Sequence, residues 1–425
     1  MDFEFGVEDE AFRSEARAWL AEHLVGEYAQ ARGSGGPGSE HEGGEIRQAW
    51  ERELGRGGWI GIGWPSDGSG APNSYKTKGP YGNRTATLTQ QVIWAEEYAR
   101  AQAPARYGHI GENLLAPTLL AYGSQEQKDE FLPAIASGEQ MWCQGYSEPG
   151  AGSDLAGLRT TAVREGDSYR ITGQKIWTSL AHDADWCFVL ARTEAGSLRH
   201  KGISFLLVPM DQPGRIDVRP ITQLTGTSEF NEVFFDGALA RAGHVVGGEG
   251  NGWQVAMGLL AFERGVSTLV QQIGFADELG RVLKEAAASG AVTDPVVRER
   301  LVRQWAELRT MRWNALRTLG GTSDPGAPSV AKLLWGRWHQ RLGELAMQVR
   351  GTLATIGPCD WSRSAPYELD ALQRLFLFTR ADTIYGGSDE IQRGIIAERV
   401  LGLPKEPRSS AQGAQGSPGS QGGDR

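Results

Sequence analysis

The sequence predicts an α+β fold made of three consecutive parts: a helical first third, a compact β-rich middle and a helical last third. Apolar residues recur at helical spacing before Met141 and after Gly252. Between these positions, short β-branched and aromatic runs alternate with Gly or Asp turns. We therefore expect domains at 1–140, 141–250 and 251–404.

The first third starts with an amphipathic helix over residues 8–30, in which apolar side chains recur every three or four positions. Gly, Ser and Pro then dominate residues 32–44, so we expect a mobile loop there. Helical periodicity resumes at Ile46. It recurs in three later segments, 85–103, 112–122 and 125–137.

The middle third contains runs such as DWCFVLART and KGISFLLVPM, which are typical of strands in a small β domain. After Gly252 the period returns to that of helices, and it continues until Leu403. Beyond Pro404 the chain has almost no apolar residue and cannot bury enough surface to offset the entropy of ordering. We expect a disordered tail at 405–425.

The composition of the 425 residues excludes several classes of protein. A net charge of −9 argues against a nucleic-acid partner, and no stretch approaches the apolar length of a membrane span. Cys143, Cys187 and Cys359 lie far apart without CxxC spacing, and the histidines are scattered, so we expect no disulfide framework and no metal site. These features favour a cytoplasmic protein without a membrane anchor.

One basic segment departs from the acidic balance. Between Arg298 and Arg317, further arginines alternate with Trp305 and Trp313 at helical spacing. Two interpretations remain open here, a solvated helix face with buried tryptophans or a binding site for a phosphate-bearing ligand.

The most informative segment is YSEPGAGSD at 146–154. Gly150 and Gly152 would let backbone N–H groups approach a phosphate closely, and Ser153 adds a hydroxyl donor. Some twenty residues later, Trp177 offers a flat apolar wall for a ring system. An ordinary loop and a buried strand tryptophan are the alternatives for these two features.

Three motifs in this order make the chain resemble the acyl-CoA dehydrogenase family, from Phe3 to Leu403: YSEPGAGSDLAG at 146–157, GQKIWTS at 173–179 and TIYGGSDEIQRGIIAERVLG at 383–402. The resemblance implies a helical domain, a middle β-barrel and a C-terminal four-helix bundle, with FAD between barrel and bundle. It also implies dehydrogenation of an acyl-CoA, with electron-transfer flavoprotein as the electron acceptor.

The resemblance also assigns residues to FAD by their place in these motifs. The isoalloxazine ring would be contacted by Tyr146, Ser147, Trp177 and Ser179. The phosphate groups would meet Gly152 and Ser153. The adenine-dinucleotide part would be held by Gln348, Gly351 and the segment from Ser388 to Gln392, which includes Glu390.

The base that removes the α-proton is absent from its usual place in the family. Many members carry Glu in a YEGT-like motif, whereas the motif here reads YGGS at 385–388 and places Gly386 in that slot. Asp389 and Glu390 follow closely, but acidic residues at the start of a helix are common caps. We therefore look for the base elsewhere.

Glu263, which directly precedes Arg264, is the better candidate. It lies in a helix predicted from Trp253 to Phe275, whose first half is apolar all round, and burying a charge there is costly. Burial would raise its pKa toward the working pH, although Arg264 opposes this if the two pair directly. Some family members place their base at the equivalent point. A structural ion pair is the alternative.

The resulting hypothesis is that Glu263 removes the α-proton, Arg264 contacts the substrate, and the β-hydrogen leaves as hydride to flavin N5. By resemblance, the backbone N–H of Gly386 and a ribityl hydroxyl would hold the thioester carbonyl. The region after the base lacks the RxxFG motif that many homotetrameric members carry. The oligomeric state is therefore left open: the chain could form a dimer or a tetramer, with identical or with different chains.

Two other functions remain open on this fold. One is a half-site or non-catalytic subunit of a mixed complex, which in this family often acts on bulky steroid-type or dicarboxylic acyl thioesters. The other is a flavin oxidase or monooxygenase that uses oxygen.

Overall fold

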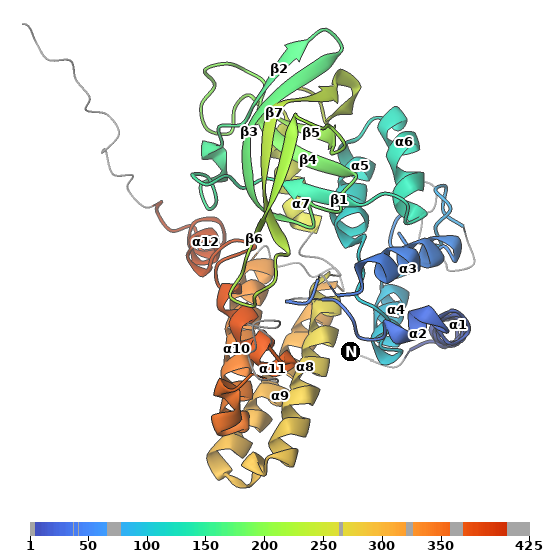
Figure 1. Cartoon of the computed structure of the whole chain (residues 1–425), viewed down its shortest axis with the longest axis vertical. Helices are drawn as coiled ribbons and strands as arrows, with labels where there is room; N and C mark the ends of the chain where they lie inside the picture. Colours follow the sequence, from blue (N-terminus) through green and yellow to red (C-terminus); the bar gives the residue numbers. More distant parts are fainter. Residues whose placement is uncertain are drawn as a thin grey trace, which may run out of the picture.

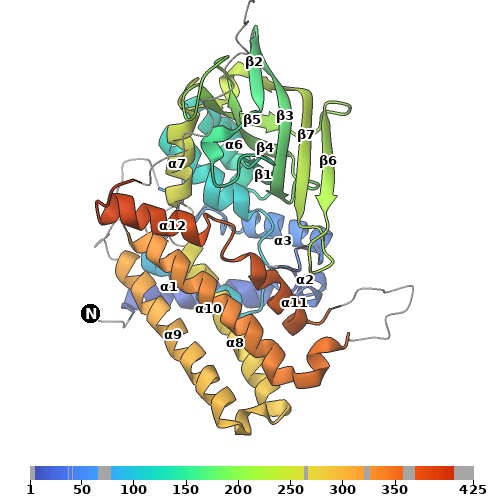
Figure 2. The same cartoon turned by 90° about the vertical axis from the view of Figure 1, so that its left-hand side faces the viewer.

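The computed structural model describes residues 5–36, 38–40, 42–65, 78–262, 267–319, 326–357 and 369–405. Figures 1 and 2 show three parts in space: a β-sheet at one end, an elongated bundle of helices at the other, and the N-terminal helices beside both. This is the α+β architecture predicted from the sequence.

Over its described residues, the N-terminal part contains the α-helices α1 (Val7–His23), α2 (Glu27–Gln30), α3 (Gly44–Arg56), α4 (Leu88–Arg100), α5 (Ala116–Tyr122) and α6 (Gln125–Ala136). A π-helical turn at Gly111–Leu115 leads into α5. Thr87 and Ser124 close capping boxes at the starts of α4 and α6. The centre of α1–α4 is aromatic, with the Trp59 and Trp94 rings stacked at 4.1 Å.

The middle part is one eight-stranded sheet. Its strands are β1 (Trp142–Gly145), β2 (Thr161–Glu165), β3 (Ser168–Ser179), β4 (Trp186–Arg192), β5 (Ile203–Pro209), β6 (Ile216–Ile221), β7 (Phe230–Arg241) and β8 (Val245–Val246). The strand order is β6-β7-β3-β2-β4-β5-β8, and β1 pairs with β4 in parallel. β4 and β5 are buried almost throughout, which explains their continuous apolar runs.

The C-terminal part contains α7 (Gly252–Phe262), α8 (Ser267–Ala288), α9 (Pro295–Leu319), α10 (Ala327–Arg350), α11 (Ala371–Phe378) and α12 (Asp389–Ile395). α8, α9 and α10 pack on one another, and α11 packs on α10. Their shared core includes Phe275, Leu301, Trp338 and Leu342. No helix in the described ranges is long and apolar enough to cross a membrane.

α7 and α8 belong to different cores, although the sequence predicts one helix from Trp253 to Phe275. α7 packs on β5 and α5, and its Leu259 joins the core that contains Phe131 and Phe205. α8 packs on α9 and α10 (Figure 2). Residues 263–266, between these two helices, lie outside the described part of the chain.

The tryptophans of the basic segment are not buried, contrary to one of the two sequence interpretations. Trp305 and Trp313 on α9 are 54% and 51% exposed. The Arg309 guanidinium lies 5.9 Å from the centroid of each ring, which suits a cation–π contact on the surface of the helix. Helical spacing placed these residues on one face correctly, but this face does not pack on the bundle.

The Gly- and Ser-rich segment at 32–44, which the sequence predicts as a mobile loop, makes several hydrogen bonds over the residues described. Arg47, whose side chain is fully buried, donates 2.8 Å to the Ala105 carbonyl, 2.5 Å to the Glu40 carbonyl and 2.9 Å to the Glu40 carboxylate. The Glu40 N–H in turn donates to the Glu229 carboxylate of the β domain at 3.2 Å. One buried guanidinium therefore ties this loop to α3 and to the segment after α4.

Replacing Arg47 with Met is expected to lower the free energy of unfolding by about 3 kcal/mol, because it leaves buried acceptors without a donor. Urea unfolding followed by tryptophan fluorescence measures this loss. Arg56→Met is the control: Arg56 is 64% exposed beside Glu53, and such surface pairs contribute roughly 0–1 kcal/mol. Equal losses in the two variants would contradict this assignment.

Candidate active site

The YSEPGAGSD loop leaves β1 and is fastened to β3 by a buried ion pair. The Glu148 carboxylate accepts from Lys175 Nζ at 2.8 Å, and both side chains are buried. Lys175 Nζ also lies 3.2 Å from the Tyr146 carbonyl. The other contacts of Glu148 are the backbone N–H groups of Arg159, at 2.6 Å, and Thr160, at 2.9 Å.

Electrostatics favour the ionised form of Glu148. Burial by itself would raise the pKa of this carboxyl, but the Lys175 charge and the hydrogen bonds lower it below its usual value. Burial lowers the pKa of Lys175, and the Glu148 charge partly opposes that effect. The pair is fully surrounded by protein, so removing either partner would strand the other charge.

The tip of the same loop is open. Glu148 and Ala151 exchange backbone hydrogen bonds at 3.0 and 3.2 Å, which closes a tight turn at the start of the tip. A Cβ added to Gly150 or to Gly152 would meet no atom within 4 Å, and Gly152 and Ser153 are exposed. Backbone N–H groups on a rigid, uncovered turn are suited to an anionic ligand such as a phosphate.

Trp177 lies at an irregularity of β3 and is strained. Its backbone has φ +61°, in the left-handed region that non-glycine residues rarely adopt, and the pairing with β7 shifts register between Lys175 and Thr178. The side chain is 56% exposed, with its edge toward Phe230. The alternative of a buried strand tryptophan is therefore wrong. Ser179, two residues later, pairs with Phe230 in β7.

The YGGS turn precedes α12, which lies at the end of α10 nearest the sheet (Figures 1 and 2). Gly386 and Gly387 have φ +63° and +83°, so an L side chain in either position would be strained. Gln392 Nε2 donates to the carbonyls of both glycines, at 3.2 and 3.3 Å. Among the described residues, no acceptor faces the Gly386 N–H.

The acidic residues after this turn lie in the first turn of α12 and pair with arginines. The N-cap is Ser388, which accepts from the Ile391 N–H at 3.4 Å. Asp389 is buried and accepts from Arg337 Nε at 3.0 Å, and Glu390 is an exposed partner of Arg393 at 3.6 Å. Ser388, and neither carboxylate, is therefore the cap, although both acidic residues lie at the start of the helix as the sequence indicates.

The structure does not bring all the predicted site residues together. Gln348 and Gly351 lie at the C-terminal end of α10, where Gln348 accepts from Arg300 at 2.7 Å. Arg337, which contacts α12, lies 11 residues earlier on the same helix, or about 16 Å along its axis. Within one chain the two predicted adenine-binding segments are therefore far apart. Glu263 and Arg264 lie outside the described residues.

The ion pair between Glu148 and Lys175 was not predicted from the sequence. Glu148 and Lys175 stand in the two motifs, but no role was predicted for either. The signal was present, because Glu148 is one of two charged residues in YSEPGAGSD, with Asp154, and Lys175 is the charged residue of GQKIWTS. Charges of opposite sign in two neighbouring buried segments indicate a pair.

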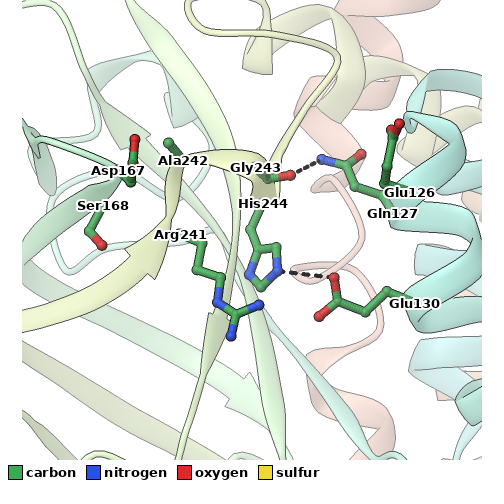
Figure 3. Close-up of a pocket in the computed structure, with 9 residues that line it drawn as sticks. All are labelled: Glu126, Gln127, Glu130, Asp167, Ser168, Arg241, Ala242, Gly243 and His244. Atoms are coloured by element: carbon green, nitrogen blue, oxygen red, sulfur yellow. Dashed lines mark hydrogen bonds and ion pairs between the residues drawn. The ribbon is translucent and has the colours of Figure 1, made fainter.

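A cavity with a volume of about 530 Å³, shown in Figure 3, lies between α6 and the β domain. His244 Nε2 lies 3.3 Å from the Glu130 carboxylate, and Gln127 donates to the Gly243 carbonyl at 2.7 Å. None of the site residues predicted from the sequence lines this cavity. It joins two domains and is separate from the loop of residues 146–154.

The Glu148–Lys175 pair predicts how stability depends on pH. A carboxyl whose pKa is lower in the folded state stabilises the protein above its unfolded pKa of about 4.3, and this contribution is lost as pH falls through the lower folded value. Glu148→Gln is expected to destabilise by about 3 kcal/mol at pH 7 and to lose less on acidification. Urea unfolding at neutral and acidic pH tests this. Glu139→Gln, an exposed control, should behave as wild type.

Models of three domains from one protein family match most of the chain. The acyl-CoA dehydrogenase N-terminal domain matches residues 7–139, the middle domain 143–238 and the C-terminal domain 250–401. The chain is 54% identical over 401 residues to the acyl-CoA dehydrogenase IpdE1 of Mycobacterium tuberculosis, covering 94% of this chain and 99% of that protein. It is 52% identical over 410 residues to IpdE1 of Mycolicibacterium smegmatis, with the same coverage, 94% and 99%.

Solved structures agree with these relatives. The steroid ACAD Tcur3481–Tcur3483 superposes with a TM-score of 0.78 at 28% identity, covering 96% of this chain and 100% of that one. The ChsE4–ChsE5 complex of Mycobacterium tuberculosis gives a TM-score of 0.74 at 30% identity, with coverage of 96% and 100%. The chain therefore belongs to the acyl-CoA dehydrogenase family of flavoprotein oxidoreductases.

Proposed function

We propose that this chain is a cytoplasmic, FAD-dependent dehydrogenase that removes the α-proton and the β-hydride of an acyl-CoA thioester, with Glu263 as the base. Two observations together carry the proposal. The tip of the 146–154 loop is uncovered and suits the phosphates of FAD, and the YGGS turn at 385–388 has no carboxylate of its own. FAD would accept the hydride at N5 and pass the electrons to electron-transfer flavoprotein.

The residues of the 146–154 loop and of β3 fit FAD. Gly150 and Gly152 leave their backbone uncovered, Ser153 adds an exposed hydroxyl, and the Glu148–Lys175 pair keeps the loop rigid. Rigid donors need no reorganisation when an anion binds. Trp177 presents a half-exposed ring and follows Ile176, whose N–H donates to the Ser147 carbonyl of this loop at 2.9 Å. Tyr146, Ser147 and Ser179 complete the proposed flavin contacts. These features support a bound dinucleotide with its phosphates at the loop tip.

The Gly386 N–H is the proposed donor to the thioester carbonyl. Gln392 holds the carbonyl oxygens of Gly386 and Gly387, which restrains the backbone on the C-terminal side of this N–H. A fixed donor lowers the pKa of the α-carbon by stabilising the enolate oxygen. In this arrangement the turn acts through its backbone.

Glu263 is the proposed base because its rivals near the turn are engaged. A carboxylate in the Gly386 position would be strained by φ +63°. Asp389 is buried beside Arg337, and Glu390 points to Arg393 in the exposed cap. Glu263 follows α7, whose apolar face packs under the sheet. A carboxylate that follows such a helix in the sequence is suited to proton removal, with Arg264 as the proposed substrate contact.

We also propose a bulky, ring-bearing acyl group and an oligomer in which a second copy of this chain completes the FAD site. The acyl group is supported by the glycine slot and by a similar structure named as a steroid ACAD. The oligomer is supported by the distance between Gln348 and α12, which leaves the adenine end of FAD to a neighbouring chain. The second candidate function is a half-site subunit that needs a different chain of the family for activity, and the similarity to the ChsE4–ChsE5 complex favours it.

Glu263→Gln tests the base. We expect flavin reduction by an acyl-CoA to slow by roughly 10³-fold in anaerobic stopped-flow measurements, while FAD content stays at the wild-type level. Wild-type reduction rates in this variant, or an equal loss in Glu390→Gln, would remove Glu263 from this role. A panel of acyl-CoAs of different chain length and bulk, used in the same measurements, addresses the substrate class.

Trp177→Ala tests the flavin wall. We expect the dissociation constant of FAD to rise by roughly 10-fold, because the contact between the tryptophan ring and the flavin is lost. The fold itself should tolerate the change, because the Trp177 side chain is half-exposed. Trp305→Ala is the matched control, since Trp305 is exposed to the same degree on α9. Fluorescence titration of flavin-depleted protein measures both constants. An equal change in the two variants would count against the assignment.

A further inference from the structure

A buried histidine connects α8 and α10 to the segment that enters the YGGS turn. His339 of α10 has Nδ1 2.8 Å from Asp382 and Nε2 2.8 Å from Glu278 of α8. A neutral imidazole carries one N–H, so donating to two carboxylates requires the doubly protonated ring. His339 therefore links two elements that are far apart in sequence.

The surroundings of His339 favour its cationic form. Burial by itself would lower the pKa of this imidazole, but the Glu278 charge and the hydrogen bonds to both carboxylates outweigh burial and raise the pKa to about 9. Phe275 lies 4.3 Å from the ring centroid, and Trp338 is nearly parallel to it. These aromatic rings keep water away, which strengthens the charged hydrogen bonds.

Asp382 extends this link to Tyr385. The Asp382 carboxylate is fully buried, and its second oxygen accepts from the Tyr385 hydroxyl at 2.8 Å. The Asp382 backbone carbonyl accepts from Lys332 Nζ, and the Tyr385 N–H donates to the Ala381 carbonyl at 3.1 Å. The Tyr385 side chain is thus held by Asp382, which α10 contacts through His339 and Lys332, and the Tyr385 backbone is held by the preceding turn.

The two glycines of the turn cannot hold their own position, because they have no side chains and many backbone conformations are open to them. Gln392 restrains the carbonyl oxygens from the side of α12. Tyr385 supplies the restraint from the other side, through Asp382 and His339. A misplacement of about 1 Å at such a donor can cost on the order of 10²-fold in rate.

We propose that Glu278, His339 and Asp382 form a charged array that positions the Gly386 N–H toward the acyl carbonyl, which makes His339 and Asp382 positioning residues of the dehydrogenation. The proposal rests on the proposed function of the Gly386 turn. None of the three side chains needs to touch the reacting atoms, because the array acts through Tyr385.

The first arm of the test measures the turn directly. In the FAD-loaded full chain, Tyr385→Phe and His339→Gln are expected to accelerate hydrogen–deuterium exchange of the amides at 383–389 by about 10-fold, corresponding to local opening. Tyr169→Phe and His244→Gln are matched controls. Tyr169 donates to Glu249 at 2.7 Å and His244 contacts Glu130, both away from this turn. Unchanged exchange at 383–389 in the two test variants would overturn the proposal.

The second arm uses the same preparations and measures anaerobic flavin reduction by octanoyl-CoA and cyclohexylpropanoyl-CoA. We expect rates to fall about 10-fold with FAD content unchanged, and the carbonyl stretch of the bound thioester to move to higher frequency as its hydrogen bond weakens. Faster exchange with wild-type rates and an unshifted carbonyl stretch would show a merely structural link and overturn the proposal.

The outcomes separate this proposal from the proposed function. A wild-type flavin that neither thioester reduces would overturn the proposed function itself, whatever the exchange data show. A wild type that is reduced, with variants that match it in both arms, would overturn only the array. If His339→Gln fails to fold, Tyr385→Phe still decides, because it removes a single oxygen atom.

Discussion

The buried ion pair between Glu148 and Lys175 is the constraint on which the candidate site depends. It joins the loop after β1 to the middle of β3, where the Ile176 N–H also donates to the Ser147 carbonyl at 2.9 Å. Both charges lie inside the protein, where a broken pair costs about 3–5 kcal/mol. The loop is therefore rigid without any side chain covering its tip, as a binding surface for an anionic cofactor requires.

The other half of the site follows from a missing side chain. Gly386 has no side chain and lies in a left-handed backbone turn. The turn itself needs external support, which the structure provides through Gln392 on one side and through Tyr385, Asp382 and His339 on the other. In the proposed function, proton removal is therefore assigned to Glu263, which follows α7 in the sequence, and the glycine slot supports a bulky acyl group.

Much of this could be predicted from the sequence, because periodicity reports local structure directly. The order of helical, β-rich and helical parts and the place of the YSEPGAGSD loop follow from spacing and turn residues. Three features could not be predicted this way. Arg47 binds a carbonyl 58 positions away, and His339 meets partners 43 and 61 positions away, which no local pattern records. The exposure of Trp305 depends on which helix face packs, and spacing does not specify that.

The most direct test of the account is the visible spectrum of the chain purified alone, followed by anaerobic addition of cyclohexylpropanoyl-CoA. The account predicts a yellow protein whose flavin band is bleached by this thioester and recovers only slowly in air. A folded but colourless protein, or a flavin that bleaches only after a second chain of the family is added, would contradict the claim that this chain carries its own dehydrogenase site.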